Sequence, residues 1–444
     1  MVDPLALEIA ELAVEASRAA GATEAEACCT IARRFSATAR GDVVEKLEQA
    51  TGRALRLRVF AGEPGGLRAT TLGTTDLTPQ TIRAFAKRAV EAARLVGPDP
   101  FAGLPAPSPV NGVADLRIDA QDVRETDSAA KLDDVRSLER AARAVDPRIE
   151  NSNGSLVADA VMTIGFANSA GARAAYRSTS ASRTASPVGR DGDDKRTATY
   201  GTAARSWREC EDSLTVGKTA AHRLLSMFGA RSVPTQKMPV IFERDVAAAV
   251  LSDVFSALYG ANVATGNSYL IGRLGEQIGS PLVTIVDDGR LPAGLASAPF
   301  DAEGVPTRRT VVFEKGILRT FLCDTYYARK LGVTSTASAS GPNNFHLEPG
   351  AGSLDDLIAQ TENGIVVLGT IGFATEYASG TYSRGAHGWL VENGEIVCAV
   401  ENFSIAAHFA DLLANIDRVA GDLRFDGSVV SPSFRVAEMT VSGT

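Results

Sequence analysis

The strongest turn signal in the chain lies in the stretch Trp389-Leu390-Val391-Glu392-Asn393-Gly394-Glu395-Ile396-Val397-Cys398-Ala399-Val400. Asn-Gly between two apolar-rich runs favours a tight type I′ turn, because both residues tolerate the positive φ that this turn requires. The stretch therefore predicts a β-hairpin. A similar hairpin is expected upstream, where Lys315-Gly316 joins apolar runs at 309–314 and 317–322.

These hairpins belong to a C-terminal segment, residues 234–444, in which strand signals outnumber helix signals. Short strands are expected at 239–242 and 283–286, and an amphipathic helix at 244–259. Many strands with few helices are typical of a largely antiparallel sheet or a barrel. We therefore expect a β-rich, barrel-like C-terminal domain that also contains helices.

Two α/β segments precede this domain, at residues 1–105 and 106–233, with a proline-rich linker at 97–108. A chain of 444 residues has room for three domains at about 150 residues each. Asn151 to Gly154 is expected to form a hairpin turn, and 186–205 an exposed loop that flanks a strand. The predicted fold class is α+β. Apolar periodicity predicts helices at 5–19, 78–96, 127–145 and 210–228, and strands at 26–37, 42–49, 54–60 and between 149 and 183.

The composition excludes several functional classes. There are 45 Lys plus Arg and 53 Asp plus Glu, so 45 − 53 gives a net charge of −8, which argues against direct nucleic-acid binding. The four histidines leave little material for metal sites or imidazole catalysis. The longest apolar stretch, 364–374, is far shorter than the ~20 residues that span a bilayer. We expect a cytoplasmic protein without membrane contact, whose middle-segment arginines lie on solvated faces.

The densest group of candidate site residues is Gly380, Ser383, Arg384, Gly385 and His387. Its glycines would let backbone N–H groups approach a peptide, and Arg384 would bind an anion. The structural alternative, a glycine-bent strand leading into the Trp389 hairpin, is favoured. Ser383 and His387 could be a nucleophile and its base, but a spacing of four residues on a strand or loop says little about contact between them. The chain has no GxSxG, Walker, GxGxxG or HExxH motif.

Other candidate residues have a structural interpretation. Asp287, Asp288, Asp301 and Glu303 could hold a cation or serve acid–base chemistry, but carboxylates next to Gly and Pro more often form turns and caps. His346 is expected in a loop without a second metal ligand nearby, and His408 inside an apolar helix at 405–413. We expect this chain to have no metal site and no cofactor.

Ordered blocks of distinctive sequence cover nearly all of residues 239–444. They are Asp287-Asp288, Pro299-Phe300-Asp301-Ala302-Glu303-Gly304-Val305-Pro306-Thr307-Arg308, Glu314-Lys315-Gly316-Ile317-Leu318, Ala328-Arg329-Lys330-Leu331-Gly332, Glu348-Pro349-Gly350, Asn363-Gly364-Ile365, Tyr382-Ser383-Arg384-Gly385-Ala386-His387-Gly388-Trp389-Leu390, Glu392-Asn393-Gly394-Glu395-Ile396 and Ser431-Pro432-Ser433. Through these blocks the C-terminal segment resembles the TldD/PmbA family, whose two branches form a heteromeric cytoplasmic zinc protease.

The resemblance implies which branch this chain belongs to. The TldD branch binds zinc through an H-E-x-x-x-H helix and a late cysteine. Here the corresponding helix has Leu251 and Ser256 near the histidine positions and Ser252 near the glutamate, and no cysteine follows Cys398. The chain is therefore similar to the PmbA branch, also called TldE and described as a modulator of DNA gyrase. One departure is Ser404 to His408, where the family usually has a T-I-A-G-N-like stretch.

The resemblance implies a non-metal-binding subunit that helps bind unfolded peptides and present them to a TldD-like zinc-bearing partner in a heterodimer. Two alternatives stay open from the sequence. One is an independent serine-type hydrolase that uses Ser383 and His387. The other is a regulatory binding protein that acts on DNA gyrase or on toxin–antitoxin components.

Overall fold

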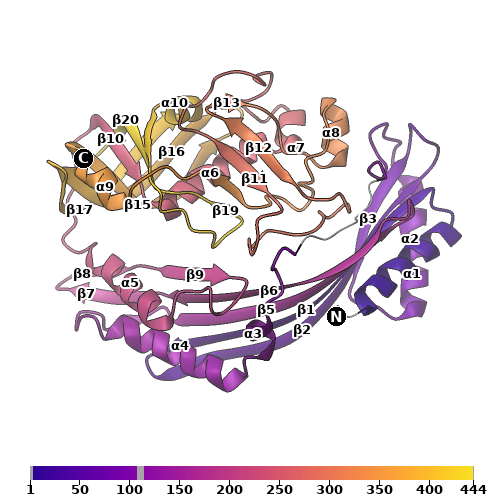
Figure 1. Cartoon of the computed structure of the whole chain (residues 1–444), viewed down its shortest axis with the longest axis horizontal. Helices are drawn as coiled ribbons and strands as arrows, with labels where there is room; N and C mark the ends of the chain where they lie inside the picture. Colours follow the sequence, from indigo (N-terminus) through magenta and orange to yellow (C-terminus); the bar gives the residue numbers. More distant parts are fainter. Residues whose placement is uncertain (1–3, 108–114, 444) are drawn as a thin grey trace.

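The computed structural model describes residues 4–107 and 115–443, and in them a long curved sheet passes beneath a C-terminal domain (Figure 1). The sheet has six strands in the order β3-β2-β1-β5-β6-β9, all antiparallel to their neighbours. β1 pairs along its length with β2 on one side and β5 on the other, so one sheet joins strands from both sides of residue 105. The domain boundary near that residue stays a prediction. The strands are β1 (Glu24–Arg40), β2 (Val43–Ala61), β3 (Arg68–Thr74), β5 (Ser155–Asn168), β6 (Arg173–Ala185) and β9 (Tyr200–Ala204).

Helices cover one face of this sheet at its two ends (Figure 1). Helices α1 (Leu5–Ala19) and α2 (Pro79–Leu95) pack over Ala25, Ala27 and Cys29 of β1. Helices α4 (Ser128–Arg143) and α5 (Ser213–Leu225) pack over the odd-numbered residues Phe35 to Ala39 of the same strand. Alternate side chains of a strand point to opposite faces, so the odd-numbered apolar residues of β1 define the helix-covered face. The short helix α3 (Gln121–Glu125) precedes α4.

The C-terminal domain contains a closed five-stranded barrel, because β10 pairs with both β15 and β20 and the remaining neighbours pair in sequence. The β10–β15 pair is parallel and the other pairs are antiparallel. This arrangement confirms the α+β class with a largely antiparallel, barrel-like C-terminal domain. The barrel strands are β10 (Gln236–Phe242), β15 (Asn363–Glu376), β16 (Thr381–Glu392), β17 (Glu395–His408) and β20 (Phe434–Ser442), with β18 (Ile416–Val419) added beside β20.

Helix α6 (Arg244–Leu258) lies between the barrel and a second sheet of the order β13-β12-β11-β14-β19. Its buried residues Val250, Val254 and Leu258 join the largest hydrophobic core of the molecule. A helix buried on several sides can hold a polar side chain only if that side chain is paired. The remaining elements are β11 (Ile285–Asp288), β12 (Arg309–Glu314), β13 (Ile317–Leu318), β14 (Phe345–Leu347), β19 (Val429–Val430), α7 (Gly260–Ala264), α8 (Thr325–Leu331), α9 (Leu354–Ala359) and α10 (Phe409–Ala414).

Both predicted C-terminal hairpins are present. Asn393 and Gly394 join β16 to β17 with φ values of 52° and 78°, and Lys315 and Gly316 join β12 to β13 with φ values of 49° and 83°. Positive φ at both central residues is the conformation that the type I′ turn requires.

Several local predictions in the first half were wrong. The strands expected at 42–49 and 54–60 are one strand, β2, and the loop expected at 186–205 contains β7 (Pro187–Asp191), β8 (Asp194–Thr197) and β9. Asn151 to Gly154 is not a hairpin turn. Instead β4 (Asn151–Ser152) pairs with β7 while β5 pairs with β1, and Gly154, at φ 103°, redirects the chain between these two sheets.

Two histidines lie in other elements than expected. His346 is in strand β14 rather than in a loop, with its Nδ1 atom 3.0 Å from the carbonyl oxygen of Asn344. His408 ends strand β17 and caps helix α10, because its Nδ1 accepts a hydrogen bond of 3.1 Å from the Ala410 N–H. The strand extends to His408 because it pairs with Thr381 on β16, so the helix starts four residues later than its apolar pattern suggests.

Arginines join the curved sheet to the C-terminal domain. Arg58 on β2 forms ion pairs with Glu26 on β1 (2.9 Å) and with Glu303 of the C-terminal domain (2.7 Å). Arg205 is buried and donates to the carbonyl oxygens of Gly294 and Ser297, both at 3.1 Å. The expectation that the middle-segment arginines are solvated was therefore wrong for Arg205. In the part of the chain described, no helix is both long and apolar enough to cross a membrane.

Candidate functional site

A buried ion pair joins helix α6 to strand β16 of the barrel. The Nη2 atom of Arg384 on β16 lies 2.9 Å from Oδ2 of Asp253 on α6, and the two side chains are only 13% and 10% exposed. A charged pair at this depth requires good geometry and further hydrogen bonds to compensate for the water that both groups have lost.

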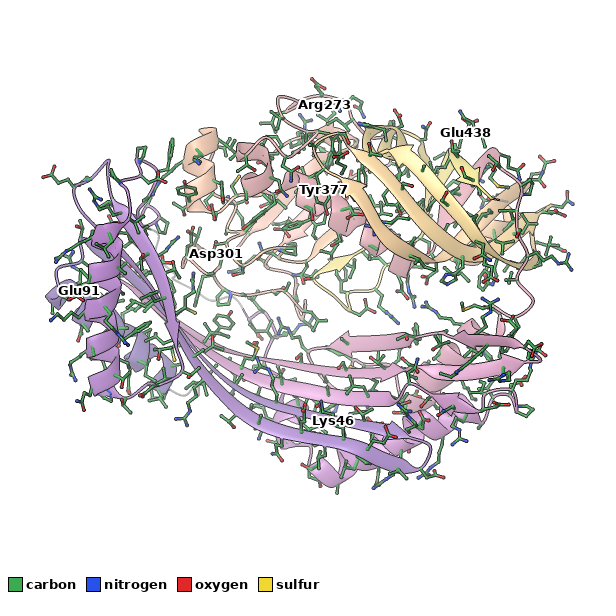
Figure 2. The ribbon with its side chains drawn as sticks, turned by 180° about the vertical axis from the view of Figure 1, so that it is seen from behind. Lys46, Glu91, Arg273, Asp301, Tyr377 and Glu438 are labelled. Carbon is green, nitrogen blue, oxygen red and sulfur yellow. The ribbon has the colours of Figure 1, made fainter. Side chains whose placement is uncertain are left out.

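Strand β15 and the loop after it supply those hydrogen bonds. Thr375 Oγ1 donates to Oδ2 of Asp253 over 3.1 Å, and the Tyr377 hydroxyl donates to Oδ1 over 3.2 Å. Arg384 donates to Thr375 Oγ1 over 3.0 Å and also to the backbone carbonyl of Gly372. The Asp253 carboxylate therefore fixes the ends of β15 and β16 against α6. Figure 2 labels Tyr377 within the C-terminal domain.

The outer edge of β15 is open next to this ion pair. Strand β10 pairs with β15 only from Ile365 to Val367, whereas β15 continues to Glu376. No described strand pairs with that side of β15 beyond Val367. Bulges interrupt the β15–β16 register after Val367 and after Ile371, and the Ile371 side chain is 69% exposed. An open edge with bulges is a typical place for binding sites on sheets.

Strand β16 carries four of the five candidate residues, and Gly380 lies in the turn before it. Arg384 reaches α6, and the backbone of Gly385 pairs with Ile371 of β15. Ser383 and His387 are four residues apart on the strand, about 13 Å at 3.3 Å per residue, so they cannot share a hydrogen bond. The glycine-bent strand favoured from the sequence is confirmed, and the serine-type hydrolase has no geometric support.

His387 and Gly380 have separate surroundings. His387 lies against Gly369 of β15, and burial lowers the pKa of its imidazole, with a smaller raising effect of the Glu401 charge. Glu401 itself is paired with Arg196 of the middle segment over 2.9 Å. Gly380 has φ 72° at the turn before β16. Peptide binding by these residues stays a prediction.

The carboxylates singled out from the sequence serve the fold. Asp287 accepts hydrogen bonds from the backbone and the side-chain amide of Asn343, at 2.7 and 3.0 Å. Asp301 accepts from the backbone N–H groups of Glu303 and Val305. Burial raises the pKa of Asp287 to about 6 and that of Asp301 to about 6. Within residues 4–107 and 115–443, no group of three or more His, Cys, Asp and Glu side chains could hold a metal ion.

Helix α6 has aliphatic and hydroxyl side chains at the positions that correspond to the H-E-x-x-x-H motif of the zinc-binding branch. Leu251 is buried in the core, and Ser252 is exposed. The Ser256 hydroxyl donates to the backbone carbonyl of Ser252 over 3.0 Å. None of these three offers an imidazole, a carboxylate or a thiolate, which are the side-chain types that bind zinc in proteins.

Sequence reasoning missed Asp253, Thr375 and Tyr377. Asp253 had a detectable signal, because it is the one acidic residue among the buried positions of an otherwise apolar helix face. Thr375 and Tyr377 had none, since only the barrel topology brings β15 next to α6.

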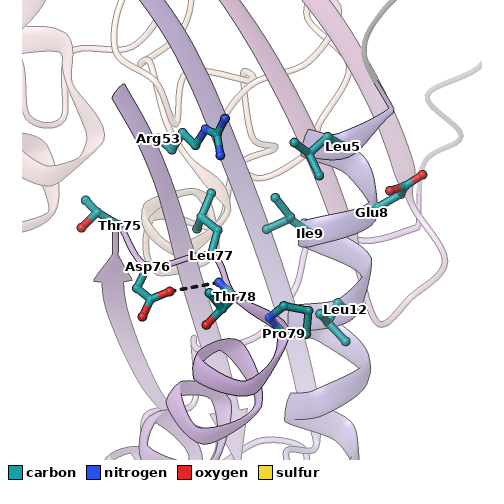
Figure 3. Close-up of a pocket in the computed structure, with 10 residues that line it drawn as sticks. All are labelled: Leu5, Glu8, Ile9, Leu12, Arg53, Thr75, Asp76, Leu77, Thr78 and Pro79. Carbon is teal, nitrogen blue, oxygen red and sulfur yellow. Dashed lines mark hydrogen bonds between the residues drawn. The ribbon is translucent and has the colours of Figure 1, made fainter. Parts of the chain in front are cut away.

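A separate pocket of about 420 Å³ lies on the helix-covered face, between α1 and the start of α2 (Figure 3). Leu5, Ile9 and Leu12 form an apolar wall. Asp76 accepts hydrogen bonds from the Thr78 N–H (3.0 Å) and from Thr81 (2.9 Å), which lowers the pKa of its carboxyl. The polar groups of this pocket thus stabilise the start of α2.

The chain forms a curved sheet joined to a closed five-stranded barrel, with a buried helix between the barrel and a second sheet. Along almost its whole length it matches metallopeptidase domains. Residues 25–93, 121–228 and 235–443 match the models of domain 1, the central domain and the C-terminal domain of PmbA/TldA metallopeptidases. The chain belongs to the PmbA/TldD family, as its C-terminal blocks suggested.

Full-length relatives agree with this assignment. The chain is 33% identical to the metalloprotease PmbA of Escherichia coli O157:H7 over 418 residues, covering 92% of this chain and 90% of that protein. It is 32% identical to a PmbA homolog of Haemophilus influenzae over 442 residues, covering 97% and 94%. A crystal structure of a candidate modulator of DNA gyrase from Bacteroides thetaiotaomicron superposes with a TM-score of 0.93 at 26% identity, covering both chains completely. TldE of Thermococcus kodakarensis shares the fold, with a TM-score of 0.87 at 21% identity over 98% of this chain and all of that one.

Proposed function

We propose that this chain is the non-metal-binding subunit of a TldD/TldE-type cytoplasmic metalloprotease. It binds unfolded peptides and presents them to a zinc-bearing partner subunit. The observation that carries the proposal is the combination of PmbA likeness over almost the full length with Leu251, Ser252 and Ser256 on α6. Zinc in the partner supplies the activated water, and this chain supplies surface and orientation.

The open edge of β15 is the proposed place of peptide binding. An extended peptide can add to it as a further strand, because main-chain hydrogen bonds require no particular peptide sequence. Arg384 fixes this edge through Gly372 and through Asp253, so the strand that receives the peptide is already rigid. The exposed Ile371 side chain offers apolar contact to a peptide residue. Gly380 in the turn after β15, and Ser383, Gly385 and His387 on β16, complete the proposed binding surface.

A second candidate function has support in two related structures. The proteins from Bacteroides thetaiotaomicron and Thermotoga maritima are both described as candidate modulators of DNA gyrase, each at 26% identity to this chain. A regulatory role on gyrase would not require peptide cleavage, so it is separable by experiment.

The test is co-expression with a TldD-like subunit, followed by cleavage of an unfolded peptide. We expect cleavage only when both chains are present. Ile371→Arg should raise the KM for the peptide with little change in kcat, because it disturbs the edge and leaves the partner's zinc intact. Ile396→Arg is the matched control, since Ile396 is similarly exposed (46%) but lies at the far end of the barrel strands. Equal effects of the two variants would contradict β15 as the binding edge, and gyrase capture without a TldD-like chain would favour the regulatory role.

A further inference from the structure

The outer edge of β2 is unusually long and open. Strand β3 pairs with β2 only from Leu55 to Ala61, so residues 43–54 have a neighbour, β1, on one side only. Twelve residues at about 3.3 Å each give an open edge of ~40 Å. In Figure 2, Lys46 lies on this strand at the outer side of the curved sheet.

One bulge interrupts this edge, at Glu45, where the register to β1 shifts between Val44 and Lys46. From residue 46 to residue 54 the edge is regular and contains no proline, and its side chains are all exposed. Val43 is 64% exposed and Leu47 is 53% exposed. Long, regular edges with exposed apolar side chains pair readily with another strand, and monomers usually prevent this with bulges, prolines or inward-pointing charges.

The charge pattern of the edge is complementary to itself. In antiparallel pairing about a two-fold axis at Leu47, Lys46 of one copy lies opposite Glu48 of the other, and the same pair recurs on the opposite side of the axis. Leu47 then faces its own copy, so no like charges are opposed next to the axis. Opposite charges directly across from each other stabilise a sheet, and like charges destabilise it. Among the described residues of one chain, Lys46 and Glu48 form an ion pair with each other alone, at 2.9 Å, and their side chains are 62% and 58% exposed, where such a pair contributes little.

We propose that a second copy of this chain pairs with the β2 edge in antiparallel register about Leu47, so that two curved sheets form one continuous sheet. A pocket of about 670 Å³ lies on the face of the same sheet and extends from residues 47–50 of β2 across β1 and β5 to Ser180 and Ser182 of β6, so it is not part of the paired edge. This interface is independent of the proposed protease function and requires no partner of another kind.

Charge reversal tests the pairing on the full chain. We expect the wild-type protein to be a dimer by light scattering, and Lys46→Glu and Glu48→Lys each to weaken the dimer by about tenfold or more, because each opposes two like-charge pairs. An equimolar mixture of the two variants should dimerise again, and so should the double variant. Both positions are exposed, so circular dichroism and the melting temperature should stay unchanged. A monomeric wild-type chain, or no recovery in the mixture, overturns the proposal.

Cysteine cross-linking tests the register. Leu47→Cys should form a disulfide-linked dimer under mild oxidation, because the two copies of position 47 face each other. Thr51→Cys is the matched control on the same face of the strand, and its two copies would lie ~26 Å apart. The wild-type chain, with its native cysteines, gives the background. Cross-linking of Gln49→Cys in preference to Leu47→Cys overturns the proposed axis. If thiol reagents fail to reach Leu47→Cys only when a TldD-like chain is present, the edge binds that partner, and this result would overturn pairing between copies.

Discussion

At the scale of single residues, the ion pair of Asp253 and Arg384 is the feature that most constrains the candidate site. Both charges are nearly buried, and Asp253 also accepts hydrogen bonds from Thr375 and Tyr377. Its place on α6, two residues after Leu251, puts a carboxylate–guanidinium pair in the region where the zinc-bearing branch has its ligand helix. Through this pair, helix α6 anchors strands β15 and β16, a role that the sequence of the helix alone does not reveal.

Removal of one partner from this pair should be costly. We expect Asp253→Asn to lower the free energy of unfolding by about 3–5 kcal/mol, because it leaves the Arg384 charge buried without its counter-charge. Chemical denaturation measures the change. Lys237→Ala, which breaks an ion pair that is 67% and 60% exposed, should cost at most about 1 kcal/mol. Similar losses in the two variants would show that the buried pair is not what holds β15 and β16 to α6.

Asp287 gives a prediction about pH. Its folded pKa, about 6, is above the value of about 4 for an unfolded aspartate, because burial disfavours the charged form. The folded state therefore binds more protons between these values, and the stability that Asp287 contributes is present below pH 4 and decreases as the pH rises to 6. The decrease is about 3 kcal/mol, because each pKa unit corresponds to about 1.4 kcal/mol. Asp287→Asn should reduce this decrease in denaturation curves recorded across the range, and an unchanged pH profile would contradict the assignment.

At the scale of elements, β16 depends on glycine at one position and not at another. A Cβ atom on Gly388 would lie 1.8 Å from the carbonyl oxygen of Val366, whereas one on Gly385 would lie 3.4 Å from that of Ile371. We expect Gly388→Ala to destabilise the barrel by about 1–3 kcal/mol or more, since backbone has to move. Gly385→Ala should leave the melting temperature nearly unchanged. A comparable loss of stability in Gly385→Ala would contradict this difference and would mean that β15 cannot shift away from a Cβ atom at position 385.

The same scale shows what could be predicted from the sequence. The Asn393-Gly394 hairpin was predictable, because its turn requires a conformation that few residues adopt. The length of β2 was not, since Ala50, Thr51 and Gly52 resemble a break and the exposed strand lacks an alternating burial pattern. The strands between residues 187 and 204 were hidden for a similar reason, because polar residues pair well at the edge of a sheet and contribute no apolar signal.

At the scale of the whole molecule, arginines hold the curved sheet against the C-terminal domain. In the sequence these arginines look the same as arginines that are exposed to solvent. Whether such an arginine is buried and forms a salt bridge depends on segments that are far away in the chain. Arg58 and Glu303 are 245 positions apart, and no local pattern connects them. The fold class and the family could be read from the sequence, whereas the contacts between the two halves and the Asp253 site could not.

Arg58 is the place to test this connection. Arg58→Met would leave Glu26 and Glu303 facing each other with side chains 1% and 3% exposed, so we expect a loss of about 3–5 kcal/mol in stability. Limited proteolysis should cut the variant faster between the two halves. Arg53→Met is the control, because Arg53 is exposed on the same strand and forms no ion pair with any described residue, so it should cost at most about 0.5 kcal/mol. Equal proteolysis of the two variants would contradict a joining role for Arg58.

The account as a whole depends on which subunit carries the metal. The most direct measurement is the zinc content of each chain after an active complex with a TldD-like subunit has been separated, together with the peptide cleavage by each chain alone. The account predicts zinc in the partner, none in this chain, and cleavage only after the two are recombined. Stoichiometric zinc in this chain, with cleavage in the absence of any partner, would contradict it.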